Sequence, residues 1–286
     1  MTRPVGFMDV SLFEKIASQM KYNKIVSLHH FGDPLLHPRI GELINILHKY
    51  HISASFSCNP QALSDEKIND LLDSQLDHLN ISLDGATKET YENLRGGAAN
   101  YEMALDGIDR LLKEKLKRQS DKPEIVISMI HMKETDKEIE DFKAKWIPQS
   151  GVNEVQVKPF IRWEGAFKDI NEMAEDTQLN KSFKKKQDYP CFWPWSRLVV
   201  LWDGRVVPCC YDYDGKFVIG DLNNQTIKEI WNSPAMHRLR QFEINNTPCA
   251  LCKKCHEKEG SPPSKWFPFN LIFKGKLNFS SYFKFN

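Results

Sequence analysis

The sequence has no long hydrophobic run, almost no net charge and hardly any cysteine in its first two thirds. A membrane-spanning helix needs about 20 consecutive apolar residues, and no stretch approaches that length. The opening Met1-Thr-Arg-Pro-Val-Gly-Phe-Met lacks the apolar core of a signal peptide. A net charge of +1 creates no strong field for nucleic acid, so no such partner is expected. These absences favour a cytoplasmic enzyme, in whose reducing surroundings clustered cysteines bind metal more often than they form disulfides.

Six of the seven cysteines lie in the last third of the chain, at spacings typical of a metal centre. The segment Pro248-Cys249-Ala-Leu-Cys252-Lys-Lys-Cys255 contains two Cys-x2-Cys steps that share their middle thiol. A turn at Asp203-Gly204 is expected to fold Cys209 back, with Cys191, towards that segment. We therefore predict a metal site; the alternative is a set of scattered structural thiols.

The ligand set and the metal are only partly determined by spacing. Cys191 and Cys209 are the firm pair, Cys210 is a spare, and spacing does not rank Cys249, Cys252 and Cys255 for the two remaining positions. Four thiolates suit a 4Fe-4S cluster or tetrahedral zinc equally well.

The first 165 residues alternate strand-like and helix-like segments. Strands are predicted at 25–30, 52–57, 78–83, 124–132 and 154–160. Between them lie amphipathic segments, among them a helix after a capping box at Ser11-x-x-Glu14, one capped by Ser64, and one over 101–117. This order predicts an α/β fold with a parallel sheet built from βαβ units, either barrel-like or doubly wound.

Polar residues follow the predicted strands. Ligands of such folds meet the carboxyl ends of the strands, so these residues are candidates for a site. They are His30-Phe-Gly-Asp-Pro34, Ser57-Cys-Asn59, Ser82-Leu-Asp-Gly85, His131 and Lys158-Pro-Phe-Ile-Arg162. Taken together they predict a polar rim, although each alone would be read as an ordinary turn.

Several of these segments resemble radical SAM enzymes that carry a C-terminal SPASM-type, or shorter twitch-type, iron-sulfur domain. The resemblance covers nearly the whole chain up to about Glu259. Its motifs are Phe31-Gly32-Asp33-Pro34, similar to the family's Gly-Gly-Glu-Pro segment, Ser57-Cys-Asn59, Asn80-Ile-Ser-Leu-Asp-Gly85, Tyr91-Glu-Asn-Leu-Arg-Gly-Gly97, Trp195, Pro208-Cys209-Cys210 and Glu229-Ile-Trp-Asn-Ser233.

The resemblance implies a site for S-adenosylmethionine. Gly32 and Asp33 would hold its amino group, Ser82 and Asp84 would face its ribose and methionyl portions, and Asn59 and Arg95 complete the candidate set. It also favours iron-sulfur over zinc for the C-terminal cysteines. The implied organisation is a partial (β/α)6 TIM-like barrel over 1–165, a linker over 166–187, a cluster domain over 188–260 and an aromatic-rich tail over 261–286.

The family's defining Cys-x3-Cys-x2-Cys loop is absent from the sequence, where only Cys58 precedes Cys191. That loop binds the 4Fe-4S cluster that cleaves S-adenosylmethionine, and the residues up to Asp9 resemble the segment just after it. The resemblance thus implies a barrel without its first strand, inactive as it stands. A start codon assigned too far downstream and a genuine truncation are jointly favoured over a split protein.

The function implied by the resemblance is that of an oxidoreductase or maturase acting on a peptide or small molecule. An electron donor such as a flavodoxin or ferredoxin would be its partner. The alternative is a non-catalytic iron-sulfur or zinc protein, or a gene remnant.

Overall fold

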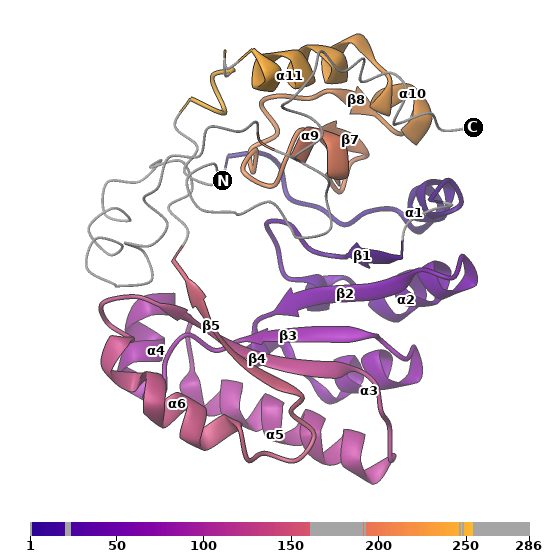
Figure 1. The fold of residues 1–286 in the computed structure, drawn as a ribbon. Helices are drawn as coiled ribbons and strands as arrows, with labels where there is room; N and C mark the ends of the chain where they lie inside the picture. The colour runs from indigo at the N-terminus through magenta and orange to yellow at the C-terminus, as the bar shows by residue number, and fades with distance from the viewer. Residues whose placement is uncertain are drawn as a thin grey trace, which may run out of the picture.

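The computed structural model describes residues 2–20, 24–160, 191, 193–245, 247 and 249–253. Its first unit is a five-stranded sheet in which every neighbouring pair is parallel (Figure 1). The strands, in sheet order, are β1 (Ile25–Ser27), β2 (Ser53–Cys58), β3 (His78–Ser82), β4 (Glu124–His131) and β5 (Glu154–Pro159). Spatial order follows chain order, which confirms the predicted α/β fold with consecutive βαβ units.

The helices after the strands share one core with the sheet. They are α2 (Ile40–Lys49), α3 (Asp65–Asp73), α4 (Lys88–Arg95), α5 (Tyr101–Lys117) and α6 (Ile139–Trp146), with short 3-10 turns η1 (Pro34–Leu36), η2 (Pro60–Ala62) and η3 (Asp136–Glu138). Alternate strand residues such as Phe56, Leu79 and Ile127 are buried against the helices. Because side chains alternate along a strand, the neighbours of these residues face the opposite side of the sheet.

Two helices differ from the sequence prediction. Helix α1 (Val10–Ala17) is capped by Asp9, whose side chain accepts hydrogen bonds from the amides of Ser11 and Leu12, so the predicted capping box at Ser11 and Glu14 is wrong. Helix α4 was not predicted, although Thr87 is its N-cap and Gly96 ends it with a φ of 83°. By contrast, Ser64 caps α3 and α5 spans 101–117 as predicted.

The second unit is small and antiparallel. Its sheet consists of β6 (Val199–Val200), β7 (Arg205–Val207) and β8 (Gly220–Asp221), with helices α9 (Trp193–Ser196), α10 (Ile227–Trp231) and α11 (Pro234–Ile244) around it. The predicted linker and aromatic tail lie outside the described residues.

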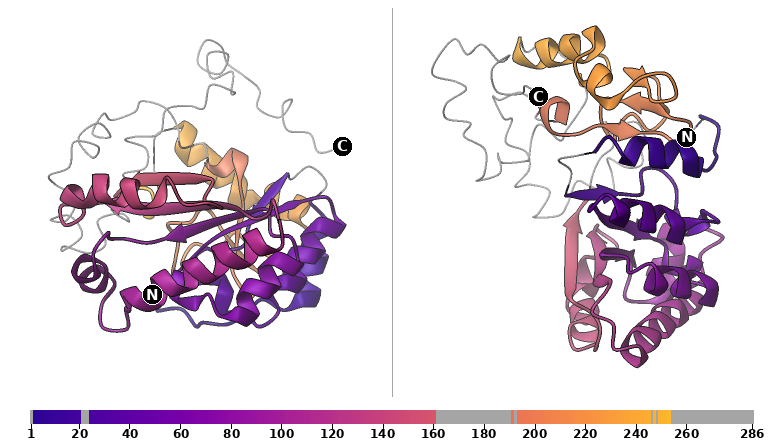
Figure 2. Two further views of the ribbon diagram at one scale, coloured as in Figure 1. Left: turned by 90° about the horizontal axis from the view of Figure 1, so that it is seen from below. Right: turned by 90° about the vertical axis from the view of Figure 1, so that its right-hand side faces the viewer.

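Helix α1 lies between the two units, beside β1 on one side and the small sheet on the other (Figures 1 and 2). Phe13 packs into the core of the large sheet, whereas Ile16 packs with Val206, Leu222 and Ile230 of the small unit. The Nζ atom of Lys15 also donates to the carbonyl of Leu222 at 3.0 Å. The first helix of the chain is therefore part of both units.

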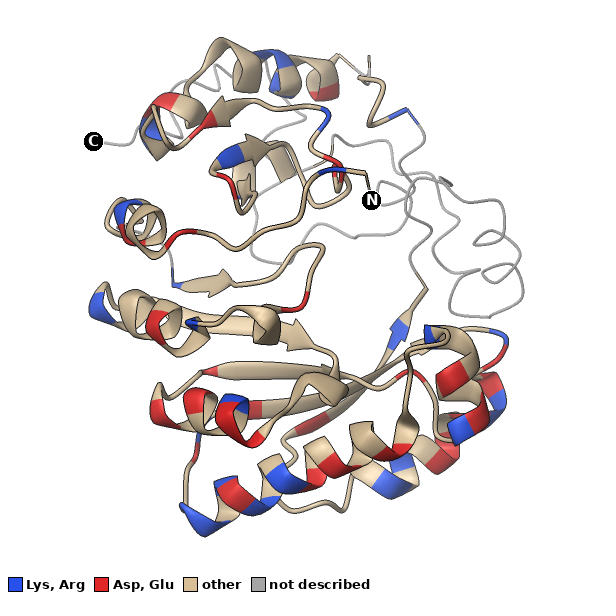
Figure 3. Ribbon diagram, turned by 180° about the vertical axis from the view of Figure 1, so that it is seen from behind, with Lys and Arg blue, Asp and Glu red and all other residues tan. Residues whose placement is uncertain are grey.

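The outer helices carry mixed charge rather than one sign, as Figure 3 shows for the face seen from behind. On α5 these charges pair one turn apart: Arg110 with Asp106 at 2.8 Å and Arg118 with Glu114 at 2.8 Å. Such exposed pairs contribute little to stability, because water and salt screen them. None of the helices in the described part of the chain is long and apolar enough to cross a membrane.

The contact between α5 and η2 depends on a glycine. A Cβ atom at Gly107 would lie 2.6 Å from the carbonyl oxygen of Pro60, which is a backbone atom and cannot move aside alone. We expect Gly107→Ala to lower the free energy of unfolding by about 1–3 kcal/mol, the usual cost of overpacking. Urea titration measures this change. Gly97→Ala is the matched control, because a Cβ there meets nothing within 4 Å, and an equal loss in both variants would contradict the argument.

Candidate functional site

The ends of β1 and β2 are tied together by Asp33. Its Oδ1 accepts from the amide of Leu35 at 2.9 Å, which caps η1, and its Oδ2 accepts from the amide of Asn59 at 2.6 Å. Burial raises the pKa of the Asp33 carboxyl above its ordinary value, and these hydrogen bonds oppose the rise. A Cβ atom at the neighbouring Gly32 would meet no atom within 4 Å, so the backbone there is open to a ligand.

The ends of β3 and β4 are joined by Asp84 and Arg95. The Asp84 carboxylate accepts from a guanidinium nitrogen of Arg95 at 2.8 Å and from the amide of Ile130 at 3.1 Å. The same guanidinium nitrogen donates to the carbonyl of Ser82 at 2.7 Å. Helix α4, which sequence reasoning missed, is what carries Arg95 into this position.

Tyr91 connects these two groups, and Cys58 is buried close to Asp33. The Tyr91 hydroxyl lies 3.2 Å from Oδ1 of Asn59, while its ring is stacked under the Arg95 guanidinium at 5.4 Å. The buried Cys58 thiol has a pKa well above its ordinary value, first because of burial and then because of the nearby Asp33 charge. The structure thus brings together the six residues predicted to bind the cofactor: Gly32, Asp33, Asn59, Ser82, Asp84 and Arg95.

The C-terminal cysteines come together only in part within the described residues. The Sγ atoms of Cys249 and Cys252 are 3.5 Å apart, a hydrogen bond rather than a disulfide, whose length is about 2.05 Å. This bond lowers the pKa of the Cys249 thiol to about 6 and raises the pKa of the Cys252 thiol, which the charge of Cys209 raises further. Cys255 lies outside the described residues.

Glu243 of α11 faces the same cysteines. Its Oε2 accepts from the amide of Cys191 at 2.9 Å, and its charge raises the pKa values of the thiols of Cys249 and Cys252. Across the described ranges, no three His, Cys, Asp or Glu side chains are grouped closely enough to hold a metal ion. The soft thiolates around α11 fit an iron-sulfur cluster, but the ligand set of Cys191, Cys209, Cys249, Cys252 and Cys255 stays a prediction.

His30 links the residues at the strand ends to the cysteines of the small unit. Its Nε2–H donates to the carbonyl of Cys210 at 2.7 Å, and the ring of the next residue, Phe31, lies 5.1 Å from that of Tyr213. The segment leading to Asp33 is therefore held against the hairpin that carries Cys209. The sequence placed His30 in the polar rim but gave no sign of its contact with Cys210, because no local pattern pairs residues so far apart in the chain.

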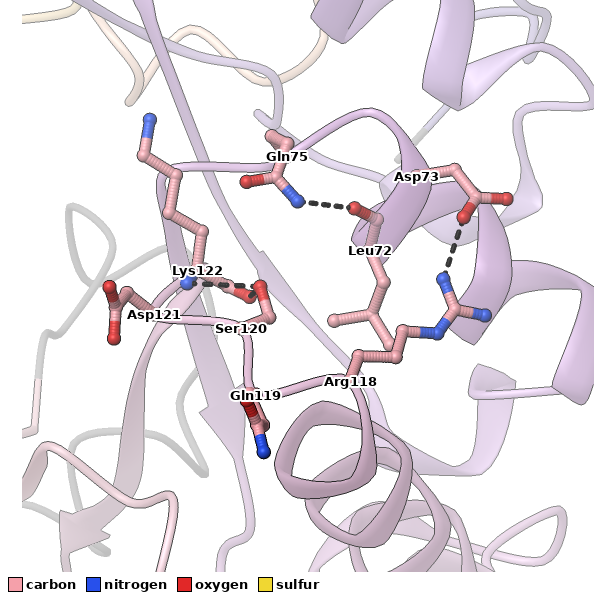
Figure 4. Close-up of a pocket in the computed structure, with 8 residues that line it drawn as sticks. All are labelled: Leu72, Asp73, Gln75, Arg118, Gln119, Ser120, Asp121 and Lys122. Carbon is pink, nitrogen blue, oxygen red and sulfur yellow. Dashed lines mark hydrogen bonds and ion pairs between the residues drawn. The ribbon is translucent and has the colours of Figure 1, made fainter.

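A separate hollow of about 620 Å³ lies between the ends of α3 and α5 and the loop to β4 (Figure 4). Two of its charged lining residues pair with each other, since Arg118 binds Asp73 at 2.6 Å. It lies at the amino ends of the strands, opposite the residues described above, and is not part of the site.

Comparison with family models gives two matches. The model of the Radical SAM superfamily matches residues 1–145, and that of SPASM, an iron-sulfur cluster-binding domain, matches residues 191–256. The second match confirms the expectation of an iron-sulfur centre in the C-terminal unit.

Curated relatives are distant but cover most of the chain. One is the tungsten-containing aldehyde ferredoxin oxidoreductase cofactor-modifying protein of Pyrococcus furiosus, 22% identical over 87% of this chain and 81% of its own length. Another is the PqqA peptide cyclase of Gluconobacter oxydans, 21% identical over 88% of this chain and 76% of its own length.

Solved structures share the fold. Streptococcus suis SuiB bound to its precursor peptide SuiA superposes with a TM-score of 0.60 at 13% identity, covering 91% of this chain and 66% of that one. Native anSMEcpe with bound AdoMet gives a TM-score of 0.58 at 14% identity, covering 89% of this chain and 81% of that one.

Proposed function

The chain belongs to the radical SAM superfamily and carries an SPASM domain at residues 191–256, and from this premise we propose that it is a peptide maturase. It would bind S-adenosylmethionine at the carboxyl ends of β1, β2 and β3, and an auxiliary 4Fe-4S cluster beside α11. Its setting would be the cytoplasm, with a flavodoxin or ferredoxin as electron donor. The relatives support a peptide substrate, since one is a peptide cyclase and another is solved with a precursor peptide.

The observation that carries this proposal is that the residues at the strand ends are held against the hairpin that carries Cys209. Asp33 and Asp84 anchor the ends of neighbouring strands, and the His30–Cys210 hydrogen bond of 2.7 Å holds that edge against the cysteine hairpin. A cofactor bound at the strand ends and a cluster in the small unit would then border the same substrate-binding region.

The protein residues have separable tasks in this proposal. The open backbone at Gly32 and the carboxyl of Asp33 would receive the amino group of S-adenosylmethionine, and Ser82 and Asp84 would receive its ribose and methionyl portions. Arg95 holds the Asp84 carboxylate in place at 2.8 Å. When bound with a reducing cluster, S-adenosylmethionine supplies the radical chemistry, whereas the protein supplies orientation and exclusion of water.

Binding of S-adenosylmethionine tests the proposed site. We expect the anaerobically reconstituted chain to bind it weakly in calorimetry, and Asp84→Asn to weaken binding about tenfold, because a charge-assisted contact is lost. Asp106→Asn is the matched control, since Asp106 also pairs with an arginine at 2.8 Å but lies on the outer face of α5. Undetectable binding by the unsubstituted chain, or equal binding by both variants, would count against the proposal.

A further inference from the structure

The inner face of the parallel sheet, opposite the helices, carries many polar side chains among a few apolar ones. Residues registered across the strands share a face, so Ser27 and Ser55 lie side by side, as do Ser57 and Asn80. The hydroxyl oxygens of Ser27 and Ser55 are 3.3 Å apart. A face that only had to pack would carry apolar side chains, as the helix-facing residues do.

A hydrogen-bonded chain crosses this face from β5 towards the end of β1. The Nζ atom of Lys158 donates to Oδ1 of Asn80 at 2.8 Å, and Nδ2 of Asn80 donates to the hydroxyl of Ser57 at 3.0 Å. The amide of Ser57 donates to Nδ1 of His29 at 3.1 Å. The ammonium group of Lys158 and the imidazole of His29 are thereby held in place by hydrogen bonds to residues of β3 and β2.

Lys158 has no ion-pair partner among the described residues, and its hydrogen-bond acceptor is a neutral amide. Burial lowers the pKa of its ammonium group, while the more distant charges of Asp84 and Glu154 raise it. Asp84 is itself bound to Arg95. An ammonium group offers three donors, so Lys158 keeps donors for a further acceptor.

His29 presents a second donor. Its Nδ1 accepts the Ser57 amide, so the neutral ring carries its proton on Nε2. Surrounding protein atoms and then the charge of Lys158 lower the pKa of the imidazole, although the residue is exposed. The neutral form with an Nε2–H donor is therefore favoured.

We propose that Lys158 and His29 form a carboxylate-binding subsite for the substrate on the inner face of the sheet, which makes an acidic peptide the preferred substrate. This inference rests on the proposed peptide maturase function. The Lys158 side chain is bound to Asn80, two residues before Ser82 in β3, and His29 follows the end of β1, so the subsite lies beside the residues assigned to S-adenosylmethionine.

Ligand-observed NMR with two small probes tests the subsite. The probes are N-acetylated, C-amidated alanyl-glutamyl-alanine and its uncharged glutaminyl counterpart, titrated into the reconstituted full chain. We expect the glutamyl probe to bind about tenfold more tightly, since its carboxylate makes charge-assisted hydrogen bonds. Lys158→Met should abolish that preference and Lys158→Arg should keep most of it, with melting curves checking that both variants fold.

Lys113→Met is the control for a change in overall charge, because Lys113 is exposed on α5 and pairs with Asp109. Equal binding of the two probes, or a preference that survives Lys158→Met, would overturn the proposal. So would loss of S-adenosylhomocysteine binding in Lys158→Met, because the carboxylate would then be that of the cofactor. If the protein bound neither S-adenosylhomocysteine nor iron, the proposed function would be refuted. The comparison of the two probes does not test that function.

Discussion

Replacing Cys209 with serine is expected to abolish the brown colour of anaerobically reconstituted protein and to remove its bound iron and sulfide. A serine hydroxyl is a harder and less acidic ligand than a thiolate, so a cluster that loses one such ligand is not retained. The same loss is expected for Cys191→Ser, the other member of the firm pair. Iron and sulfide analysis together with the visible absorption spectrum measures the result.

Cys58→Ala provides the control for this experiment. Cys58 is buried at the end of β2 in the core of the large sheet, so this variant should keep its full iron and sulfide. Full cluster content in Cys209→Ser, or one zinc ion per chain without sulfide in the unsubstituted protein, would show that the cluster assignment is wrong.

Asp77→Asn is expected to lower the free energy of unfolding by about 1–3 kcal/mol at neutral pH, because it removes a charged acceptor from three hydrogen bonds. Asp77 is 9% exposed, at the amino end of β3. Its carboxylate accepts from Nε2 of His48 at 2.8 Å, from the amide of Ala54 at 2.8 Å and from the ammonium of Lys122. Urea titration checks the loss, with the exposed Asp73→Asn as a control that should change little.

The stability that Asp77 contributes is expected to fall when the pH is lowered. Burial alone would raise the pKa of the Asp77 carboxyl, but the hydrogen bonds from Lys122, His48 and Ala54 outweigh it and hold the pKa below its ordinary value. The stabilisation that the Asp77 carboxylate contributes is therefore complete when the pH is above about 3.9, the pKa of this group in the unfolded chain. It is lost as the pH falls through the lower pKa of the group in the folded chain. A difference between wild type and Asp77→Asn that grew on acidification would contradict this assignment.

Most of the sheet could be predicted because its signals are local. Each predicted strand is observed within a few residues, and α5 is observed at its predicted ends, since Asn100 caps it and basic residues occupy its last turn. The start of α1 was predicted wrongly because Asp9 and Ser11 are both good caps and Asp9 lies before the first buried residue. Helix α4 has a single buried side chain, Tyr91, so its apolar pattern was too weak to detect.

The site could be predicted as a set of residues but not as a set of contacts. Resemblance pointed to Asp33, Asp84 and Arg95, which the structure brings to adjacent strand ends. The contacts of His30 with Cys210 and of Lys158 with Asn80 join residues far apart in the chain. Such pairs follow from how the sheet and the small unit pack, and no spacing in the sequence encodes them.

The position of α1 between the two units affects how the chain folds during synthesis. The helix leaves the ribosome long before the partners of Ile16, namely Val206, Leu222 and Ile230, have been made. Until then one side of this eight-residue helix stays exposed to water, and a helix so short is marginal by itself. Folding would therefore include a late docking step, in which the small unit completes the packing of α1.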